Sequence, residues 1–535
     1  MSNYRVSITH SRLDISITLK HTSPSPSVVS GPRKAKRGIP SKSDFNAWYP
    51  AIVEIADLVD KRYPIKGMDV WKPYGLQSMN LIDQLARREM ARTGHHEHRF
   101  PLLVPEDLLE KENRLVSRLK AARAAGLDPS DLRIEEEESG FKKEVYWVTK
   151  GGENDLEIPM FLRPTSETPM YTMFALWVRS HADLPLKTFQ IVNTFRYETK
   201  QTRSFIRVRE IHFFEAHTVH ADKEGADAQI DEDAEMVQSI LHDLCLPSLV
   251  SKRPEWDTFP GAWFTKAADV IMPNGRTLQV ATYHHYKDQW AGAFDLTYED
   301  SDGNTKQCHQ TTFGMSERLL GAVVGMHGDD NGLVMPPAVA PIQIVIMPIA
   351  QHVNQNVITA VTELEDELHK SGFRVHVDNR DLRPGAKHFD WEIKGVPLRV
   401  EIGPRDLESD SCLVSLRTGG KQDIELDSFC DKAQDLLETI SNELRSNSQL
   451  LADGLVCQFP GFDIGEDGKL ALTEPIDETL IYELPFDGSD SDAELLEKST
   501  GLTLLGESDI PYPDPISCVI TGRLTTRRQH LARMY

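Results

Sequence analysis

The stretch of sequence that decides the fold covers residues 195–210 and reads FRYETKQTRSFIRVRE. It contains five cationic side chains, although the 535-residue chain carries a net charge of -23. Apolar and β-branched residues alternate with the charges on both sides of KQTRS, which is typical of two strands joined by a short turn. We therefore expect a hairpin with Arg196 and Glu198 on one face of its first strand. Arg207 and Arg209 should share a face of the second strand.

The segments around this stretch predict a larger antiparallel sheet. Strand-like composition recurs at 144–150, 158–164, 277–286 and 292–300, and short turns connect most of the segments, which favours antiparallel pairing over a series of βαβ units. Amphipathic helices are predicted over 44–63, with Asp44 as N-cap, and over 76–94, ending at Gly94. After the proline-rich residues 335–341, strands alternate with helices, as in a small α/β domain.

Composition limits the class of protein. The acidic total argues against indiscriminate binding to nucleic acid, but it allows one local basic groove. No segment approaches the roughly 20 apolar residues of a membrane helix. The six cysteines are scattered without a CxxC pair, which indicates a reducing compartment. Residues 1–42 are rich in Ser, Pro, Lys and Arg and predict a disordered tail; a cleaved targeting segment and a misassigned start remain alternatives.

Three motifs predict a site for an anion and an amine. Arg196 on a rigid strand offers a planar fork of donors for a phosphate or carboxylate. Arg318 begins an apolar helix, where a fixed cation and the helix N-terminus both favour an anion. In TSET, Glu167 could receive a cationic amine. Each motif has a plainer interpretation: a surface hairpin with self-paired charges, an ordinary helix start, and an N-cap.

Together these motifs resemble a known family. FRYE followed by TR and RVRE, then TSET, and GMSERLLGAVVGMHGDDNGLVMPP, look like motif 2, the amino-acid loop and motif 3 of class II aminoacyl-tRNA synthetases. The resemblance is strongest to prolyl-tRNA synthetases of the archaeal and eukaryotic type, and it extends over residues 43–446 and the last residues. It implies an α+β multidomain fold. The implied parts are a tail (1–42), an antiparallel-sheet catalytic domain (43–338), an α/β anticodon-binding domain (339–447) and a small mixed C-terminal domain (448–535).

The resemblance also implies a reaction and a set of site residues. The reaction is ATP-dependent attachment of proline to tRNA(Pro) through a prolyl-adenylate. Arg196 would grip the α-phosphate and the proline carboxylate, and Arg318 the γ-phosphate. The remaining nucleotide contacts would be Glu198, Arg207, the Val208 backbone, Gln279 and Thr282. The remaining proline contacts would be Thr165, Glu167, His284 and Ser316, with Phe213 as an aromatic wall.

The same resemblance implies the cofactors and partners. ATP and Mg²⁺ are expected, and a cytoplasmic homodimer that binds tRNA(Pro) and no membrane. Some relatives hold zinc through four cysteines near the C-terminus, but here Cys518 has no CxxC partner, so we expect no zinc. In the domain at 339–447, cations near Trp391 are expected to contact the anticodon loop: Arg380, Arg383, Lys387, Lys394 and Arg405.

One segment departs from the family pattern. Many relatives have small or amide residues after the position of His284, whereas this chain reads YKDQW over residues 286–290. The change raises a first alternative, a specialised paralogue that resists an inhibitor or activates a proline analogue. A second alternative is a non-catalytic, synthetase-like protein that binds tRNA. The presence of Arg196, Glu198 and Arg318 argues against it, because loss of one transition-state contact typically lowers the rate hundreds of times.

Overall fold

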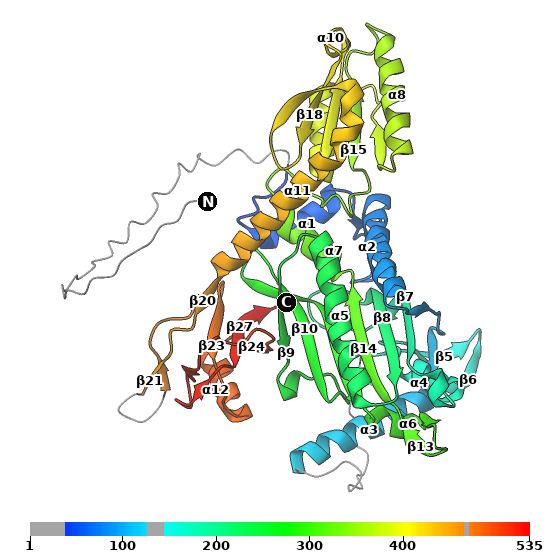
Figure 1. Ribbon diagram of the computed structural model, residues 1–535, viewed down its shortest axis with the longest axis vertical. Helices are drawn as coiled ribbons and strands as arrows, with labels where there is room; N and C mark the ends of the chain where they lie inside the picture. The colour runs from blue at the N-terminus through cyan, green and yellow to red at the C-terminus, as the bar shows by residue number, and fades with distance from the viewer. Residues whose placement is uncertain (1–37, 126–143, 465–469) are drawn as a thin grey trace, which may run out of the picture. The chain divides into compact units, whose positions relative to one another are not determined.

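A computed structural model of the chain describes residues 38–125, 144–464 and 470–535 (Figure 1). Most of the predicted N-terminal tail therefore lies outside the described residues. Within them, no helix is long and apolar enough to cross a membrane. Residues from Ile39 onward form one compact unit.

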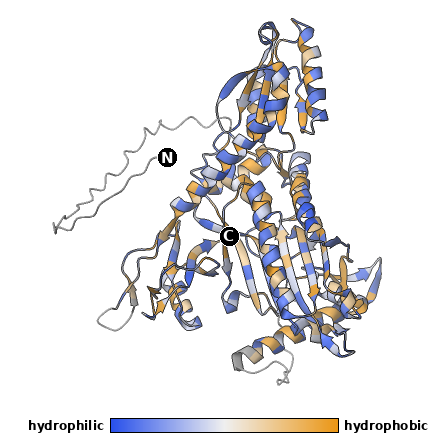
Figure 2. Cartoon of the chain, in the orientation of Figure 1, coloured by the Kyte–Doolittle hydropathy of each residue, from blue (hydrophilic) through white to orange (hydrophobic). Residues whose placement is uncertain are grey.

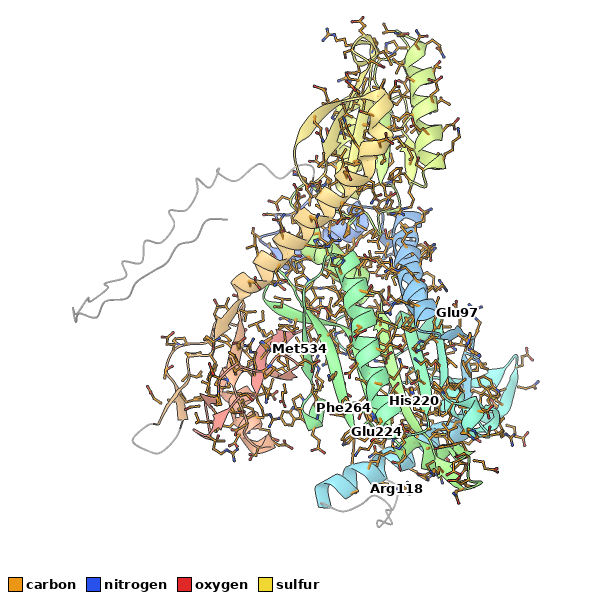
Figure 3. All side chains as sticks on the ribbon, in the orientation of Figure 1. Glu97, Arg118, His220, Glu224, Phe264 and Met534 are labelled. Atoms are coloured by element: carbon orange, nitrogen blue, oxygen red, sulfur yellow. The ribbon has the colours of Figure 1, made fainter. Side chains whose placement is uncertain are left out.

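An 11-stranded sheet organises this unit. The strand order is β20-β23-β27-β24-β9-β10-β11-β14-β8-β7-β3, and the central strands pair antiparallel as predicted. Met534 at the end of β27 and Phe264 at the start of β10 are labelled in Figure 3. The strand bounds, in chain order, are β3 (His96–Glu97), β7 (Leu186–Phe195), β8 (Glu210–His220), β9 (Ser248–Lys252), β10 (Phe264–Ile271), β11 (Arg276–Lys287), β14 (His309–Ser316), β20 (Val456–Gln458), β23 (Ile481–Pro485), β24 (Thr503–Ser508) and β27 (Arg528–Met534).

Helices cover this sheet. α5 packs on β8, β11 and β14, and Figure 1 shows it beside β8 and β14. The predicted cap of α1 is present, because Asp44 accepts a hydrogen bond from the backbone of Ala47 at 3.2 Å. α2 ends at Arg92. Thr93 is its C-cap, and Gly94 comes next with a positive φ of 77°. The helix bounds are α1 (Phe45–Ile55), α2 (Pro73–Arg92), α3 (Glu106–Ala125), α4 (Glu167–Trp177), α5 (Lys223–Asp243), α6 (Gln289–Phe294) and α7 (Arg318–His327).

The structure corrects the predicted hairpin. β7 ends at Phe195 and β8 begins at Glu210, so residues 196–209 form a connecting loop between the two strands. The loop leaves the sheet because it buries Phe205 and Ile206 in the main core. A Cβ on Gly321 would lie 2.8 Å from the Phe205 carbonyl oxygen, so glycine lets α7 pass close to the loop. The predicted shared strand face of Arg207 and Arg209 is therefore wrong.

A second sheet lies after the proline-rich segment. In it β15 pairs parallel with β16 and β17, and β17, β18 and β19 pair antiparallel. Apolar residues (orange in Figure 2) mark its strands and the packed faces of its helices. The bounds are β15 (Ile344–Pro348), β16 (Val375–Val377), β17 (Leu398–Ile402), β18 (Ser411–Leu416), β19 (Lys421–Glu425), α8 (Asn356–Lys370), α9 (Pro384–Lys394), α10 (Pro404–Glu408) and α11 (Leu426–Leu455). This is the predicted α/β arrangement.

Residues 456–535 contribute to the first sheet rather than building a separate one of similar size. β24 pairs with β9, and β27 pairs with both β24 and β11. The domain boundaries at 42, 338 and 447 stay a prediction. The remaining elements are α12 (Asp490–Thr500) and the small sheets β1 (Val59–Asp60) with β2 (Val70–Trp71), β4 (Leu103–Pro105) with β6 (Asn154–Leu162) and β5 (Tyr146–Gly151), β12 (Thr297–Glu299) with β13 (Thr305–Gln307), β21 (Phe462–Ile464) with β22 (Leu470–Leu472), and β25 (Ile516–Ser517) with β26 (Leu524–Thr525).

Candidate active site

One face of the central sheet forms the floor of a cavity of about 290 Å³. The register places Thr312 of β14 opposite His284 of β11, and Gly314 opposite Thr282. Alternate residues of a strand share a face, so these side chains point the same way. Gly314 keeps the floor open, because a Cβ there would lie 3.1 Å from the ring of Phe213.

All the site residues predicted from the sequence lie on the wall of this cavity. They come from four separate parts of the chain: the start of α4, the loop before β8, strand β11, and the junction of β14 with α7. They are Thr165, Glu167, Arg196, Glu198, Arg207, Val208, Gln279, Thr282, His284, Ser316 and Arg318. Phe213, expected as an aromatic wall, lies there too.

Two half-buried arginines form a cationic part of the cavity wall. Arg318 donates to the carbonyl of Ile206 at 2.9 Å and to that of Gln279 at 3.1 Å, which fixes its guanidinium. Burial and the nearby charge of Arg196 lower the pKa of Arg318 to about 10. Burial also lowers the pKa of Arg196, which donates to the Pro164 carbonyl at 3.2 Å. Two neighbouring guanidinium groups that repel each other favour binding of an anion between them.

Opposite charge lies at the start of α4. Glu167 is the first residue of this helix and is 1% exposed, so TSET is both a helix start and part of the cavity wall. Its carboxylate accepts from the Thr165 hydroxyl at 2.5 Å and from the Tyr286 hydroxyl at 3.1 Å. A buried carboxylate that accepts only neutral donors can still bind a cation.

Behind Glu167 lies a second buried carboxylate, which sequence reasoning missed. Glu215 accepts from the side chain of Gln190 at 2.8 Å and from the hydroxyl and backbone N–H of Ser166. His217 lies 3.3 Å from it. Burial opposes the charge of Glu215, but hydrogen bonds from His217, Ser166 and Gln190 lower its pKa below the usual range. This network holds the backbone at Ser166, next to Glu167.

A neutral histidine and an aromatic ring complete the apolar side of the cavity. Burial, with the nearby His217 and Arg196, lowers the pKa of His284 to about 3, so its imidazole is uncharged at neutral pH. Its Nδ1 lies 2.9 Å from the Thr265 hydroxyl, and its ring is 4.5 Å from that of Phe259. This side of the cavity therefore suits a small apolar ring.

The part of the cavity wall near Gln279 contains an ion pair that the sequence did not predict. Arg253 donates to Asp269 at 2.8 Å, and these side chains are 1% and 0% exposed. The same guanidinium donates to the Gln279 amide oxygen at 3.2 Å and to the Leu505 carbonyl at 2.8 Å. Leu505 lies in β24, so the C-terminal segment supports the cavity wall. Other polar or aromatic lining residues that were missed are Asp257, Phe259, Thr265, Thr312 and Glu317.

Glu317 gives a testable pH dependence. Burial raises its pKa to about 7, and its Oε2 has no hydrogen-bond partner among the described residues. The folded state then holds a proton that the unfolded state has lost, so stability falls as pH rises from about 4.5 to about 7. We expect Glu317→Gln to remove this loss, worth on the order of 3 kcal/mol. Urea unfolding without nucleotide should give the variant a larger free energy of unfolding than the parent at pH 8 and an equal one at pH 4.5. The same difference between variant and parent at the two pH values would contradict the raised pKa of Glu317.

The predicted anticodon cations are partly wrong. Lys387 is 4% exposed and donates to the Asp378 carbonyl at 2.7 Å. Trp391 is 6% exposed and its indole N–H donates to the Asp378 carboxylate at 2.8 Å. Arg380 also binds this carboxylate. Lys387 and Trp391 hold α9 on its sheet, because a buried carboxylate has to be paired, so they are not a free surface for a nucleic acid. The side chain of Arg380 is 46% exposed, and its contact with the anticodon loop stays a prediction, as do those of Arg383, Lys394 and Arg405.

Comparison with known proteins agrees with this geometry. Residues 146–327 match the class II tRNA synthetase core domain (G, H, P, S and T), and residues 343–436 match an anticodon-binding domain. The proline--tRNA ligase of Pyrococcus abyssi is 44% identical over 92% of this chain and 98% of its own length. That of Thermoplasma volcanium is 46% identical over 79% of this chain and 86% of its own length.

Solved structures give the same result. Giardia lamblia prolyl-tRNA synthetase in complex with prolyl-adenylate has a TM-score of 0.82 and 33% identity, over 92% of this chain and 99% of that one. Cryptosporidium parvum prolyl-tRNA synthetase with L-proline and AMP has a TM-score of 0.79 and 30% identity, over 93% of this chain and 99% of that one. The predicted fold class and reaction are confirmed. The chain therefore belongs to the prolyl-tRNA synthetase family of class II aminoacyl-tRNA synthetases, which ligate proline to tRNA.

Proposed function

We propose that this cavity activates proline with ATP and then transfers the prolyl group to tRNA(Pro). The observation that carries the proposal is the pairing of charges in one cavity. Half-buried Arg196 and Arg318 line the cavity together with buried Glu167. An amino acid and a triphosphate together supply the complementary charges, a cationic nitrogen and several anionic oxygens.

The proposed roles are those that the family resemblance implies for side chains lining this cavity. Arg196 binds the α-phosphate and the proline carboxylate. Arg318 binds the γ-phosphate. Glu198 and Arg207, whose side chains lie 3.3 Å apart, frame the base together with the Val208 backbone, Gln279 and Thr282. Glu167 and Thr165 accept the imino nitrogen, while His284, Ser316 and Phe213 surround the ring.

The chemistry needs no protein nucleophile. A carboxylate oxygen of proline attacks the α-phosphorus, the bond to the β-phosphate oxygen breaks, and pyrophosphate leaves with its electron pair. The terminal ribose hydroxyl of tRNA then takes the prolyl group and releases AMP. The protein contributes by holding the reactants in line and by placing Arg196 where negative charge develops. The relatives bound to prolyl-adenylate and to proline with AMP support this order of events.

Mg²⁺ is proposed to enter with ATP and to neutralise phosphate charge, since protein sites usually hold it through one or two carboxylates and the phosphates. Oε2 of Glu317, on the cavity wall, accepts no hydrogen bond from the part of the chain that the structure describes, and it fits such a cation. Among the described residues, no group of three or more His, Cys, Asp or Glu side chains could hold a metal ion. The absence of zinc stays a prediction, as do the homodimer and the cytoplasmic location.

Amino-acid-dependent ATP–pyrophosphate exchange tests the proposal. The purified chain should catalyse exchange with proline and with none of the other nineteen amino acids at comparable efficiency, and should then charge tRNA(Pro). Exchange with a proline analogue but not with proline would favour the specialised paralogue. No exchange from the folded protein would overturn the enzyme assignment and leave a binding protein.

A further inference from the structure

A tyrosine hydroxyl reaches the amine side of the cavity from the segment that departs from the family pattern. Tyr286 lies two residues after His284 in β11, at a bulge between His285 and Lys287, and it packs in the core next to the cavity. It is 0% exposed, and its hydroxyl donates to Oε1 of Glu167 at 3.1 Å. Glu167 is the carboxylate proposed above to receive the ring nitrogen of proline.

Both oxygens of Glu167 are held from different directions. Thr165 donates to Oε2 at 2.5 Å from the same loop, and Tyr286 donates to Oε1 from the sheet. Rotation of the carboxylate plane is intrinsically soft, so two fixed donors are needed to define it. Each oxygen of an ionised carboxylate can accept about two hydrogen bonds, so a cationic ligand can still bind while both hydroxyls stay in place.

Packing holds the Tyr286 ring. It lies edge-on to Tyr171 at 6.2 Å and to Phe259 at 6.3 Å, and it packs on Trp290 at 5.3 Å. Trp290 is itself 0% exposed. A ring enclosed on three sides by large aromatic residues has little rotational freedom, so the position of the hydroxyl is set before a ligand arrives.

We propose that Tyr286 is a positioning residue that orients the Glu167 carboxylate toward a cationic ring nitrogen. It thereby makes the cavity selective for proline over a ring of the same size without that nitrogen. The inference rests on the proposed function of this cavity. It also gives the 286–290 departure a role in binding the amine, because Tyr286 supplies a donor to the residue that binds it.

Tyr286→Phe removes the hydroxyl and keeps the ring that packs against Trp290. Glu167 then loses one of its two hydroxyl donors. Hydrogen bonds to charged groups are among the stronger ones in proteins, so we expect the KM for proline to rise about tenfold to a hundredfold. The KM for ATP and the kcat at saturating proline should stay within about twofold of the parent values, because Tyr286 is not among the residues proposed to contact ATP.

A matched control lies on the same strand. Tyr283 is also 0% exposed, but its hydroxyl has no hydrogen-bond partner among the described residues and its ring stacks on Phe313. Tyr283→Phe should leave the KM for proline unchanged. The decisive readout is inhibition of exchange by cyclopentanecarboxylate, which has the ring and the carboxylate of proline but no ring nitrogen. Tyr286→Phe should leave the inhibition constant of cyclopentanecarboxylate unchanged while raising the KM for proline.

The outcomes separate this inference from the function on which it rests. An active parent with an unchanged proline KM in Tyr286→Phe would overturn the positioning role alone. If Tyr286→Phe weakens binding of proline and of cyclopentanecarboxylate equally, the positioning role is also overturned, since that result indicates a distorted cavity. A folded parent without proline-dependent exchange would overturn the proposed function and the inference with it.

Discussion

Arg196→Ala is expected to lower the rate of proline-dependent ATP–pyrophosphate exchange by at least about a hundredfold. Arg196 is half-buried on the same cavity wall as Arg318, where water only partly neutralises the charge that develops on the α-phosphate. The loss should appear mainly in kcat, because the contact strengthens as the carboxylate attacks. Single-turnover formation of prolyl-adenylate would measure the same step directly.

The control for this variant is an arginine with the same chemistry and no role in the cavity. Arg62 lies on the surface and pairs with Asp60, and its side chain is 90% exposed. Arg62→Ala should exchange at the parent rate. Circular dichroism and the midpoint of thermal unfolding should show that Arg196→Ala is folded. Exchange within tenfold of the parent value would contradict the proposed role of Arg196.

Arg253→Met should destabilise the protein by about 3–5 kcal/mol, because it leaves Asp269 buried without its cationic partner. The side chains of this pair are 1% and 0% exposed and lie 2.8 Å apart. The variant also loses the hydrogen bond that joins β24 to the cavity wall at Leu505. Urea unfolding should give a lower midpoint for the transition of the main sheet. The KM for ATP should rise as well, since Arg253 holds the Gln279 amide.

A double variant separates loss of the pair from loss of packing. Replacing both partners of a buried ion pair by apolar residues is often close to neutral, because no charge is left unpaired. Arg253→Met with Asp269→Leu should therefore recover much of the stability lost in Arg253→Met. It should not recover the KM for ATP, because Gln279 still lacks its donor. Equal destabilisation of the single and double variants would show that the charge of Asp269 is not the cause.

The sequence by itself determined the chemistry of the site. Arg196 and Glu167 lie in short sequence motifs, so the charged groups of the site could be identified without knowing which segments pair in the fold. Strand composition and short turns likewise predicted antiparallel strands, because both are local features of the sequence. The helix start at Asp44 was predictable for the same reason: a cap is a contact between residues three apart.

Only the tertiary structure decided how far each strand extends and what supports the cavity. Residues 196–209 have strand composition, but the burial of Phe205 beneath α7 draws them out of the sheet. The bond from Arg253 to Leu505 joins residues 252 positions apart, and that from Tyr286 to Glu167 joins residues 119 apart. Local pattern cannot predict such contacts, because hydrophobic burial and buried hydrogen bonds depend on which segments the whole fold brings together.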